Sequence, residues 1–245
     1  MSLSSLFTPK SIAVVGASPD TKKVGHQILK KLTIAKSINL YPVNPKRKEI
    51  LGLTCYPSIL DIKGSLDLVI IVIPAFLIPE IIEQSVTKKV GAVVIVSSGF
   101  SETGPAGHKL EQKVKQIIKK TNISLLGPNC LGFANPKLNL DITFAKASPP
   151  KGNIALASQS GAVGSFLFDW ANKENLGFSK FLSLGNRAGL TETKILENLK
   201  NDPDTKVIGL YLESFANGSE FLKIASQVTK TKPVIVLFGD RKSVV

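Results

Sequence analysis

Short apolar runs rich in β-branched residues alternate with amphipathic segments along the first half of the chain. Such runs are typical of buried strands, and the segments between them are typical of the crossover helices of a parallel sheet. The predicted strands are residues 12–16, 39–43, 68–73, 92–96 and 124–126, and the predicted helices are residues 24–34, 78–89 and 106–121. The pattern therefore predicts a Rossmann-like, doubly wound α/β domain over residues 1–130.

The alternation stops at residues 131–152, where Asn135-Pro136 and Ser148-Pro149-Pro150 are turn-forming sequences, and this segment is predicted to be a linker. The alternation then restarts. The predicted strands are residues 153–157, 181–184, 206–212 and 233–238, and the predicted helices are residues 162–174, 191–199 and 219–231. We therefore expect a second, flavodoxin-like α/β domain over residues 153–245.

The composition is that of a globular protein, because 43% of the 245 residues are apolar and 20% are charged. Two cysteines and two histidines cannot supply a disulfide framework, and they do not suggest a metal site. The longest apolar stretch, residues 68–82, is interrupted by Pro74, Pro79 and Glu80 and is too short for a membrane helix. The first ten residues do not have the pattern of a secretory signal. We therefore expect a cytoplasmic protein without a membrane association.

The chain is basic, with 31 Lys and Arg against 18 Asp and Glu, a net charge of +13. Residues 1–150 hold 19 basic and 9 acidic residues, so most of the excess lies in the first predicted domain. With three arginines, one tryptophan and three tyrosines, the sequence lacks the arginine and aromatic side chains that read bases. The scarcity of these side chains argues against a nucleic-acid partner, and the positive charge is compatible with a compact anionic ligand.

The first predicted strand runs into Gly16, Ala17 and Ser18, just before the first predicted helix. In such folds a ligand lies at the carboxyl ends of the strands, with its phosphates at a helix start. Because Ser18 occupies the second glycine position, the G-x-G-x-x-G fingerprint of nicotinamide enzymes is absent. The second strand is followed by Lys46-Arg47-Lys48 and not by an acidic residue, which disfavours an NAD(P)-dependent oxidoreductase. The cluster suits a nucleotide with an extra ribose phosphate, or it is a solvated basic loop.

Small polar residues follow two further predicted strands. Ser97, Ser98 and Gly99 follow the strand at 92–96, and Asn129 and Cys130 follow the strand at 124–126. Such residues let a ligand approach the backbone and supply hydrogen bonds without bulk. Cys130 is either a thiol nucleophile or a small packing residue, and the absence of any later histidine in the sequence favours packing.

Ser160 and Gly161 stand at the predicted start of a helix in the second domain. A helix start favours an anion, and a serine there also caps the helix, so the two roles are compatible. The segment is not a G-x-S-x-G nucleophile elbow, because no glycine stands two residues before Ser160. Of the two histidines, His26 lies in the first predicted helix and can face the ligand loop, whereas His108 is expected at the surface.

Taken in order, these strand-end stretches resemble the NDP-forming acyl-CoA synthetases, the family of ADP-forming acetate–CoA ligase, related to the α subunit of succinyl-CoA synthetase. The most specific stretch is residues 125–132, LLGPNCLG. The resemblance extends over essentially the whole chain and includes residues 6–11, 15–18, 41–46, 99–102, 158–161, 183–186, 201–205 and 211–213.

The resemblance implies a CoA-binding domain followed by a succinyl-CoA-synthetase-type ligase domain. In that family, acid, CoA and ATP are converted reversibly to acyl-CoA, ADP and phosphate through an acyl phosphate and a phosphohistidine. The implied positions at CoA are Gly16, Ala17 and Ser18 at the diphosphate, Lys46 near the nucleotide phosphates, Ser97, Ser98 and Gly99 along the site, and Asn129 and Cys130 at the thiol end. Ser160 and Gly161 would hold phosphate or phosphohistidine, and Glu213 would orient the catalytic histidine.

One departure from the family concerns that histidine, which the resemblance places in a Gly- and Ser-rich loop shortly after the last predicted strand. No histidine follows His108 in this sequence. The resemblance also implies an ATP-grasp β-type subunit or domain that binds ATP or ADP with Mg, and a small carboxylic acid or acyl-CoA as substrate. We therefore expect the CoA-binding portion of an acid–thiol ligase, truncated before the phosphohistidine and inactive alone. A non-catalytic protein that binds CoA or acyl-CoA is the alternative, so whether the chain acts as an enzyme stays open.

Overall fold

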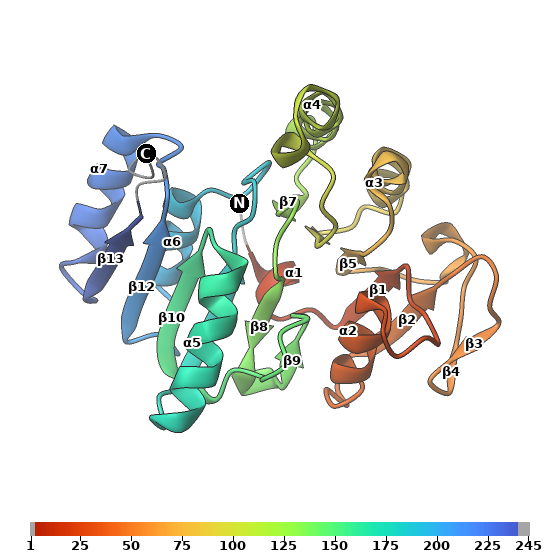
Figure 1. Ribbon diagram of the computed structural model, residues 1–245, viewed down its shortest axis with the longest axis horizontal. Helices are drawn as coiled ribbons and strands as arrows, with labels where there is room; N and C mark the ends of the chain where they lie inside the picture. The colour runs from red at the N-terminus through yellow and green to blue at the C-terminus, as the bar shows by residue number, and fades with distance from the viewer. Residues whose placement is uncertain (1–2, 240–245) are drawn as a thin grey trace.

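The computed structural model describes residues 3–239 and contains two α/β units side by side (Figure 1). The first is built on a sheet of five parallel strands in the order β2-β1-β5-β6-β7. These strands are β1 (Ser11–Val15), β2 (Asn39–Val43), β5 (Leu68–Ile71), β6 (Ala92–Ile95) and β7 (Ser124–Leu126). All five predicted strands of this unit are therefore present, within two residues of the predicted ends.

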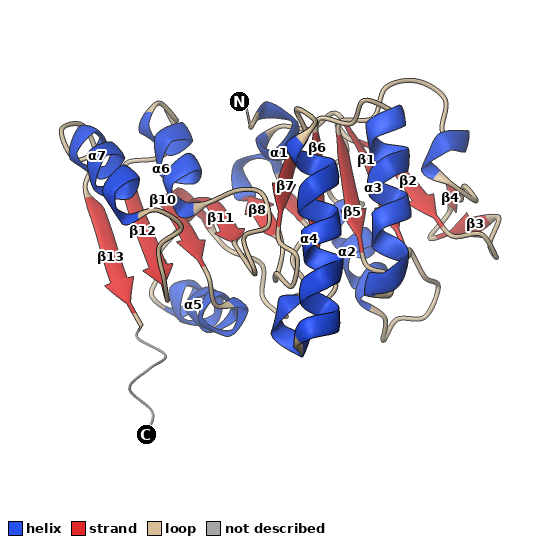
Figure 2. Ribbon diagram, turned by 90° about the horizontal axis from the view of Figure 1, so that it is seen from above, coloured by secondary structure: helices blue, strands red, loops and turns tan. Residues whose placement is uncertain are grey.

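Helices cover both faces of the first sheet, as Figure 2 shows. The three helices are α2 (Val24–Leu32), α3 (Ile78–Thr87) and α4 (Pro105–Lys119). Ile82 of α3 and Val114 of α4 pack with Val93 on one face of the sheet, whereas Leu29 of α2 packs with Val94 on the other. Because successive side chains of a strand point to opposite faces, a sheet covered on both sides is apolar throughout. This explains the continuous apolar runs in the sequence.

The second unit contains a sheet of six strands in the order β13-β12-β10-β11-β8-β9. The four parallel strands are β10 (Lys151–Ser158), β11 (Phe178–Ser183), β12 (Val207–Leu212) and β13 (Val234–Phe238). The helices are α5 (Gly161–Lys173), α6 (Glu192–Lys200) and α7 (Gly218–Val228). In Figure 2, α5 lies on one side of this sheet and α6 and α7 lie on the other. The predicted α/β fold class is confirmed for both units.

The segment at residues 131–152, predicted to be a linker, contains regular structure. It forms β8 (Phe133–Asn135) and β9 (Leu140–Asp141), which extend the second sheet in antiparallel orientation. Strands this short have no periodicity to read, so only their pairing with β11 and with each other defines them. For the same reason, the sequence pattern does not predict α1 (Ser4–Phe7) or the hairpin of β3 (Glu49–Ile50) and β4 (Leu53–Thr54). The short 3-10 helices are η1 (Ile59–Asp61), η2 (Ala75–Leu77), η3 (Ser101–Thr103) and η4 (Pro136–Leu138).

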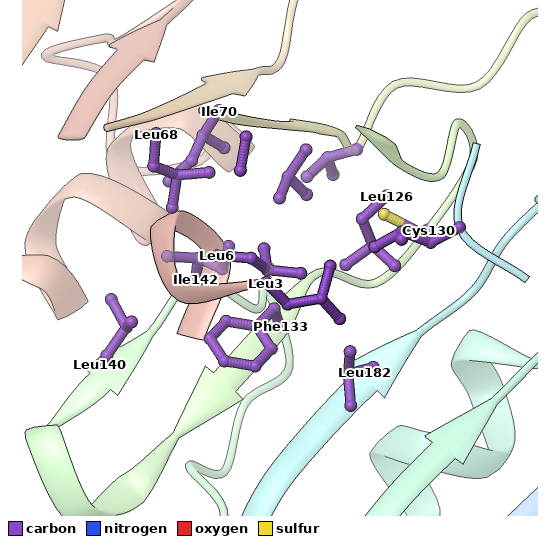
Figure 3. Packing of buried hydrophobic residues seen from close by; sticks show 14 of the residues in the cluster. Leu3, Leu6, Leu68, Ile70, Leu126, Cys130, Phe133, Leu140, Ile142 and Leu182 are labelled. Atoms are coloured by element: carbon purple, nitrogen blue, oxygen red, sulfur yellow. The ribbon is translucent and has the colours of Figure 1, made fainter. Parts of the chain in front are cut away.

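The N-terminal helix α1 fills the core between the two units (Figure 3). Leu6 is fully buried in one cluster with Leu68 of the first sheet and Phe133 of the second. The rings of Phe7 and Phe133 stack with centroids 5.6 Å apart. The two units therefore share a continuous apolar core, which fixes their relative position.

A second contact between the units is polar. Lys31 Nζ on α2 donates to Asp141 Oδ2 at 2.9 Å, to Thr143 Oγ1 at 3.3 Å and to the carbonyl oxygen of Ala145 at 2.8 Å. This ammonium group therefore has three acceptors on the segment that follows β8.

Among the helices of residues 3–239, none is long and apolar enough to cross a membrane.

Candidate functional site

A pocket of about 570 Å³ lies where the carboxyl ends of β5, β6 and β7 face the start of α5, and we call it the interdomain pocket. Both units contribute to it, so it exists only because they pack against each other. It is lined by Val24, Val72, Val96, Ser97, Ser98, Asn129, Cys130, Leu131, Phe144, Gln159, Ser160, Gly161, Ala162 and Ser165. Six of the residues implied by the resemblance therefore meet in one place.

The first-domain wall of this pocket is held by hydrogen bonds at the strand ends. Ser97 Oγ donates to the carbonyl oxygen of Ile73 at 2.6 Å, and the Asn129 amide donates to the carbonyl oxygen of Ser97 at 3.0 Å. Cys130 Sγ donates to the carbonyl oxygen of Ile95 at 3.3 Å. Burial raises the pKa of the Cys130 thiol to about 12. Cys130 is therefore a neutral packing residue of the wall, and the thiolate nucleophile considered from the sequence is not supported.

The second-domain wall is the first turn of α5. Ser160 Oγ accepts a hydrogen bond from the Val163 amide at 3.3 Å and so caps the helix. Ser158 Oγ donates to the carbonyl oxygen of Ser160 at 2.7 Å, which fixes the turn. Gly161 and Ala162 line the pocket directly behind this cap. The positive end of the helix dipole therefore faces the interdomain pocket.

A second pocket, of about 430 Å³, lies at the carboxyl ends of β1 and β2, and we call it the first-domain pocket. Asn44 organises its rim, because its Nδ2 donates to the carbonyl oxygen of Ala17 at 2.8 Å and its Oδ1 accepts from the Lys46 amide at 2.9 Å. The Lys46 side chain is exposed beside this rim. The pocket is lined by Val15, Gly16, Val43, Asn44, Pro45, Pro57, Ser58, Ile73, Leu77, Glu80, Ile81 and Gln84.

The turn after β1 is fixed against α2 by a buried histidine. His26 Nδ1 lies 3.0 Å from the carbonyl oxygen of Ser18. Ser18 Oγ accepts from the Asp20 amide at 3.1 Å, which shapes the turn before the helix. The N-cap residue of α2, Lys23, makes no side-chain capping bond. His26 therefore supports the predicted ligand loop at residues 16–18 from behind.

Glu213 directly follows β12, and its backbone contacts Gln159 of the interdomain pocket wall. Gln159 Oε1, on that wall, accepts from the amides of Glu213 at 2.8 Å and Ser214 at 3.2 Å. Gln159 Nε2 donates to the carbonyl oxygen of Ser214 at 2.8 Å. This side chain thus pairs with the backbone that carries Glu213. The roles assigned to the individual site residues stay predictions.

Sequence reasoning missed the apolar walls of both pockets. Val24, Val72, Val96, Leu131 and Phe144 line the interdomain pocket, and no polar motif marks them. Pro57 and Ser58 reach the first-domain pocket because the β3–β4 hairpin returns the chain to the edge of the sheet, where Tyr56 bridges to Val43. The only available signal was that residues just beyond a strand end face the ligand.

Within residues 3–239, no group of three or more His, Cys, Asp or Glu residues could hold a metal ion.

Comparison with known proteins assigns a family to each unit. Residues 10–136 match the CoA binding domain family, and residues 151–244 match the succinyl-CoA ligase like flavodoxin domain family. The chain is 45% identical to "Acetate--CoA ligase [ADP-forming]" of Methanocaldococcus jannaschii, covering 96% of this chain and 33% of that protein. It is 41% identical to "Acetate--CoA ligase [ADP-forming] II subunit alpha" of Pyrococcus furiosus, covering 94% of this chain and 50% of that protein.

A solved structure agrees with this assignment. The dinucleotide forming acetyl-coenzyme A synthetase 1 of Ca. Korarchaeum cryptofilum, in complex with phosphate and ADP, superimposes with a TM-score of 0.92 at 37% identity. The match covers 97% of this chain and 51% of that one. The chain thus spans a third to about half of the length of these relatives. It belongs to the ADP-forming acetate–CoA ligase family and corresponds to the α-type region, a CoA-binding domain followed by a succinyl-CoA-ligase-like domain.

Proposed function

We propose that the chain binds CoA along the carboxyl edge of its first sheet, with the nucleotide in the first-domain pocket and the thiol arm in the interdomain pocket. It does so as the CoA-binding portion of an ADP-forming acyl-CoA synthetase, which converts acid, CoA and ATP reversibly to acyl-CoA, ADP and phosphate. The observation that carries the proposal is the interdomain pocket, where Ser97, Asn129 and Cys130 face the start of α5.

The first-domain pocket has the chemistry of a purine site. Val43, Pro45 and Ile73 give it apolar walls, and Ser58 and Gln84 give it a polar end. Such a combination of apolar walls with a few polar groups is typical of small-molecule sites. Lys46, Arg47 and Lys48 are exposed on the adjoining loop, where they can meet the ribose phosphate of CoA.

The interdomain pocket has the chemistry of a phosphoryl and acyl transfer site. Its small residues leave room for a thiol, and the α5 start favours the negative charge of a phosphate or acyl phosphate. Glu213, next to this wall, would accept a hydrogen bond from the imidazole of a phosphorylatable histidine and stabilise its cation. The chain's own contribution is therefore to bind CoA and to orient that imidazole.

Neither histidine of this sequence fits that role. His26 is buried against the carbonyl oxygen of Ser18, and His108 is exposed on α4 near Ser101 and Gln112. The reacting histidine would therefore be supplied by sequence beyond these residues or by a second subunit, together with an ATP-grasp portion that binds ATP or ADP with Mg. That the Pyrococcus furiosus relative is a subunit alpha supports such a division. The chain alone is expected to be inactive.

Isothermal titration with CoA and desulfo-CoA tests the binding proposal. Lys46→Glu is expected to weaken CoA binding about tenfold or more, because it replaces an attraction to phosphate by a repulsion. Lys113→Glu is the matched control, since Lys113 is also exposed but lies on α4. Absence of heat with CoA, or equal losses in both variants, contradicts the proposal.

A non-catalytic CoA or acyl-CoA binding protein is the second candidate, and the position of the two histidines favours it. Mixing the chain with an ATP-grasp β-type subunit of a related enzyme, with acyl-CoA, ADP, Mg and phosphate, separates the candidates. CoA-dependent ATP formation that requires both proteins, and falls on Glu213→Gln, supports the synthetase. Tight CoA binding without ATP formation, when a complete α subunit is active with the same partner, supports the binding protein.

A further inference from the structure

Asn186 and Arg187 are adjacent residues of the loop after β11, and their side chains donate hydrogen bonds to different domains. Asn186 Nδ2 donates to Glu102 Oε2 of the first domain at 2.6 Å. Arg187 Nη1 donates to Glu192 Oε2 at 2.9 Å and to the carbonyl oxygen of Ser214 at 2.9 Å, both in the second domain. Two neighbouring side chains therefore connect a first-domain carboxylate with a second-domain loop.

At the first-domain end, Glu102 holds the loop of residues 97–100, which we call the CoA loop. Its Oε1 accepts from the amides of Gly99 at 2.6 Å and Phe100 at 3.1 Å, while its Oε2 accepts from Asn186. Burial raises the pKa of Glu102, but the hydrogen bonds from Asn186, Phe100 and Gly99 outweigh it, and the pKa lies below its ordinary value. Asn186 also donates to Glu111 Oε2 at 2.9 Å and accepts from Asn129 Nδ2 at 3.3 Å, but neither contact includes an amide of the CoA loop. The ionised Glu102 carboxylate therefore joins the CoA loop itself to Asn186.

At the second-domain end, Arg187 and Glu192 hold residues 213–216, which we call the Glu213 loop. Glu192 is fully buried, and its Oε1 accepts from the Ala216 amide at 2.7 Å. Arg187 Nη2 donates to Ser214 Oγ at 2.6 Å. Together with Gln159 on the other side, these groups fix the backbone on both flanks of Glu213.

The backbone between the two ends cannot easily absorb a displacement. The amides of Asn186 and Ala188 donate to the carbonyl oxygens of Pro128 and Gly127, each at 2.9 Å. A Cβ atom on Gly185 would lie 2.1 Å from the carbonyl oxygen of Pro128. A segment packed this closely moves as a unit, because packed interiors shift between discrete arrangements and do not deform continuously.

We infer that Asn186 and Arg187 are positioning residues that couple CoA binding at the CoA loop to the placement of the Glu213 loop. The inference rests on the proposed function, because it requires CoA to contact the CoA loop. Ordering of that loop by CoA passes through Glu102 to Asn186, and through Arg187 to the backbone that aims the Glu213 carboxylate. The backbone that carries the imidazole-orienting carboxylate is then held more firmly when CoA is bound.

Hydrogen exchange measured by mass spectrometry, with and without saturating CoA, tests this coupling. In the unsubstituted chain, CoA is expected to slow exchange about fivefold or more in both the CoA loop and the Glu213 loop. Protection of the CoA loop without protection of the Glu213 loop overturns the inference alone. Protection of neither loop overturns the proposed function as well.

Glu102→Gln separates the link from the binding site. The glutamine oxygen can still accept from Gly99 and Phe100, but its amino group meets the amino group of Asn186 and the connecting hydrogen bond is lost. We expect CoA to protect the CoA loop of this variant and no longer protect the Glu213 loop. Retained protection of the Glu213 loop overturns the inference.

Because Asn186 Nδ2 also donates to Glu111 Oε2 at 2.9 Å, the exchange Glu102→Gln with Asn186→Asp is combined with Glu111→Gln, which restores a donor opposite an acceptor at both contacts. It is expected to recover the protection of the Glu213 loop to within about twofold of the unsubstituted chain, which a merely structural role would not produce. Failure to recover while CoA still protects the CoA loop overturns the inference.

Arg187→Lys tests the other end, because a single ammonium cannot reproduce the guanidinium contacts to Glu192 and Ser214. It should also uncouple the loops. Asn198→Ala is the control, since Asn198 donates to the carbonyl oxygen of Lys194 within α6. In this variant, CoA should still protect both the CoA loop and the Glu213 loop.

Discussion

A Cβ atom on Gly25 would lie 2.1 Å from the carbonyl oxygen of Gly16, so α2 begins in direct backbone contact with the turn after β1. Gly16 itself has a φ of +92°, and a Cβ atom there would lie 2.7 Å from the carbonyl oxygen of Val72. The turn can place its backbone at the first-domain pocket because neither residue has a side chain.

Gly25→Ala is therefore expected to destabilise the protein and to weaken CoA binding. The methyl group must displace the β1–α2 turn, and overpacking of this kind costs about 1–3 kcal/mol. Urea unfolding followed by circular dichroism measures the stability, and calorimetric titration measures the affinity. Gly218→Ala is the control, because nothing lies within 4 Å of its would-be Cβ atom at the start of α7. Equal free energies of unfolding for the two variants would contradict the prediction, because the β1–α2 turn would then accommodate the methyl group without cost.

The fold could be predicted where a segment has a period of its own. The runs that became β1 and β6 are buried along their whole length, and the amphipathic segment that became α4 buries Val114 while exposing Lys113. β8 and β9 could not be predicted, because strands of three and two residues exist only through pairing with distant segments. The linker interpretation of residues 131–152 overlooked that pairing.

The site could be predicted at the strand ends but not across the domains. Small polar residues after predicted strands indicate a ligand site, and three of them, Ser97, Asn129 and Ser160, do meet in one pocket. Phe144 lies on the same pocket through the packing of the two units, which no local pattern reveals. No local pattern gives a role to Asn186, because its hydrogen-bond partner Glu102 lies 84 residues away in the chain.

Cys130 is expected to resist alkylation in the folded protein. Burial raises its pKa to about 12, so about one thiol in ten thousand is ionised at pH 8. Cys55 is also buried, and burial raises its pKa as well. Intact-mass analysis after iodoacetamide treatment at pH 8 should show no modification within an hour, and two modifications in denaturant. Rapid labelling of folded Cys130 would contradict the packing role, and Cys130→Ala should change CoA affinity by less than about threefold.

Leu6 should contribute strongly to stability although it lies in a helix of only four residues. It is fully buried between the two sheets with Leu68 and Phe133 (Figure 3). Leu6→Ala leaves a cavity there and is expected to lower the free energy of unfolding by about 2–5 kcal/mol. Leu222→Ala is the matched control, because Leu222 is 69% exposed and should change stability by about 0.5 kcal/mol or less. Similar effects of the two substitutions in urea titrations would contradict the buried position of α1.

The ion pair between Lys180 and Asp202 should make the free energy of unfolding depend on pH in the acidic range. Their charged atoms are 2.6 Å apart, with 4% and 11% of the two side chains exposed. Burial raises the pKa of Asp202, but the hydrogen bonds from Lys180 and Thr205 outweigh it, and the pKa lies below its ordinary value of 3.8. The folded state therefore binds this proton more weakly than the unfolded chain. The contribution to stability is full above pH 3.8 and is lost as the pH falls through the lowered value.

Asp202→Asn tests this dependence because it leaves the Lys180 ammonium buried without a counter-ion. The loss is expected to be about 3–5 kcal/mol at pH 7, the usual cost of removing one partner of a buried pair. It should shrink as the pH falls through the lowered pKa of Asp202, because the carboxyl group of the unsubstituted protein then becomes protonated as well. Lys180→Met combined with Asp202→Leu removes both charges and should recover most of the stability at pH 7. Chemical unfolding at a series of pH values measures all three proteins, and a loss that stays constant with pH would show that the pair acts through packing and not through charge.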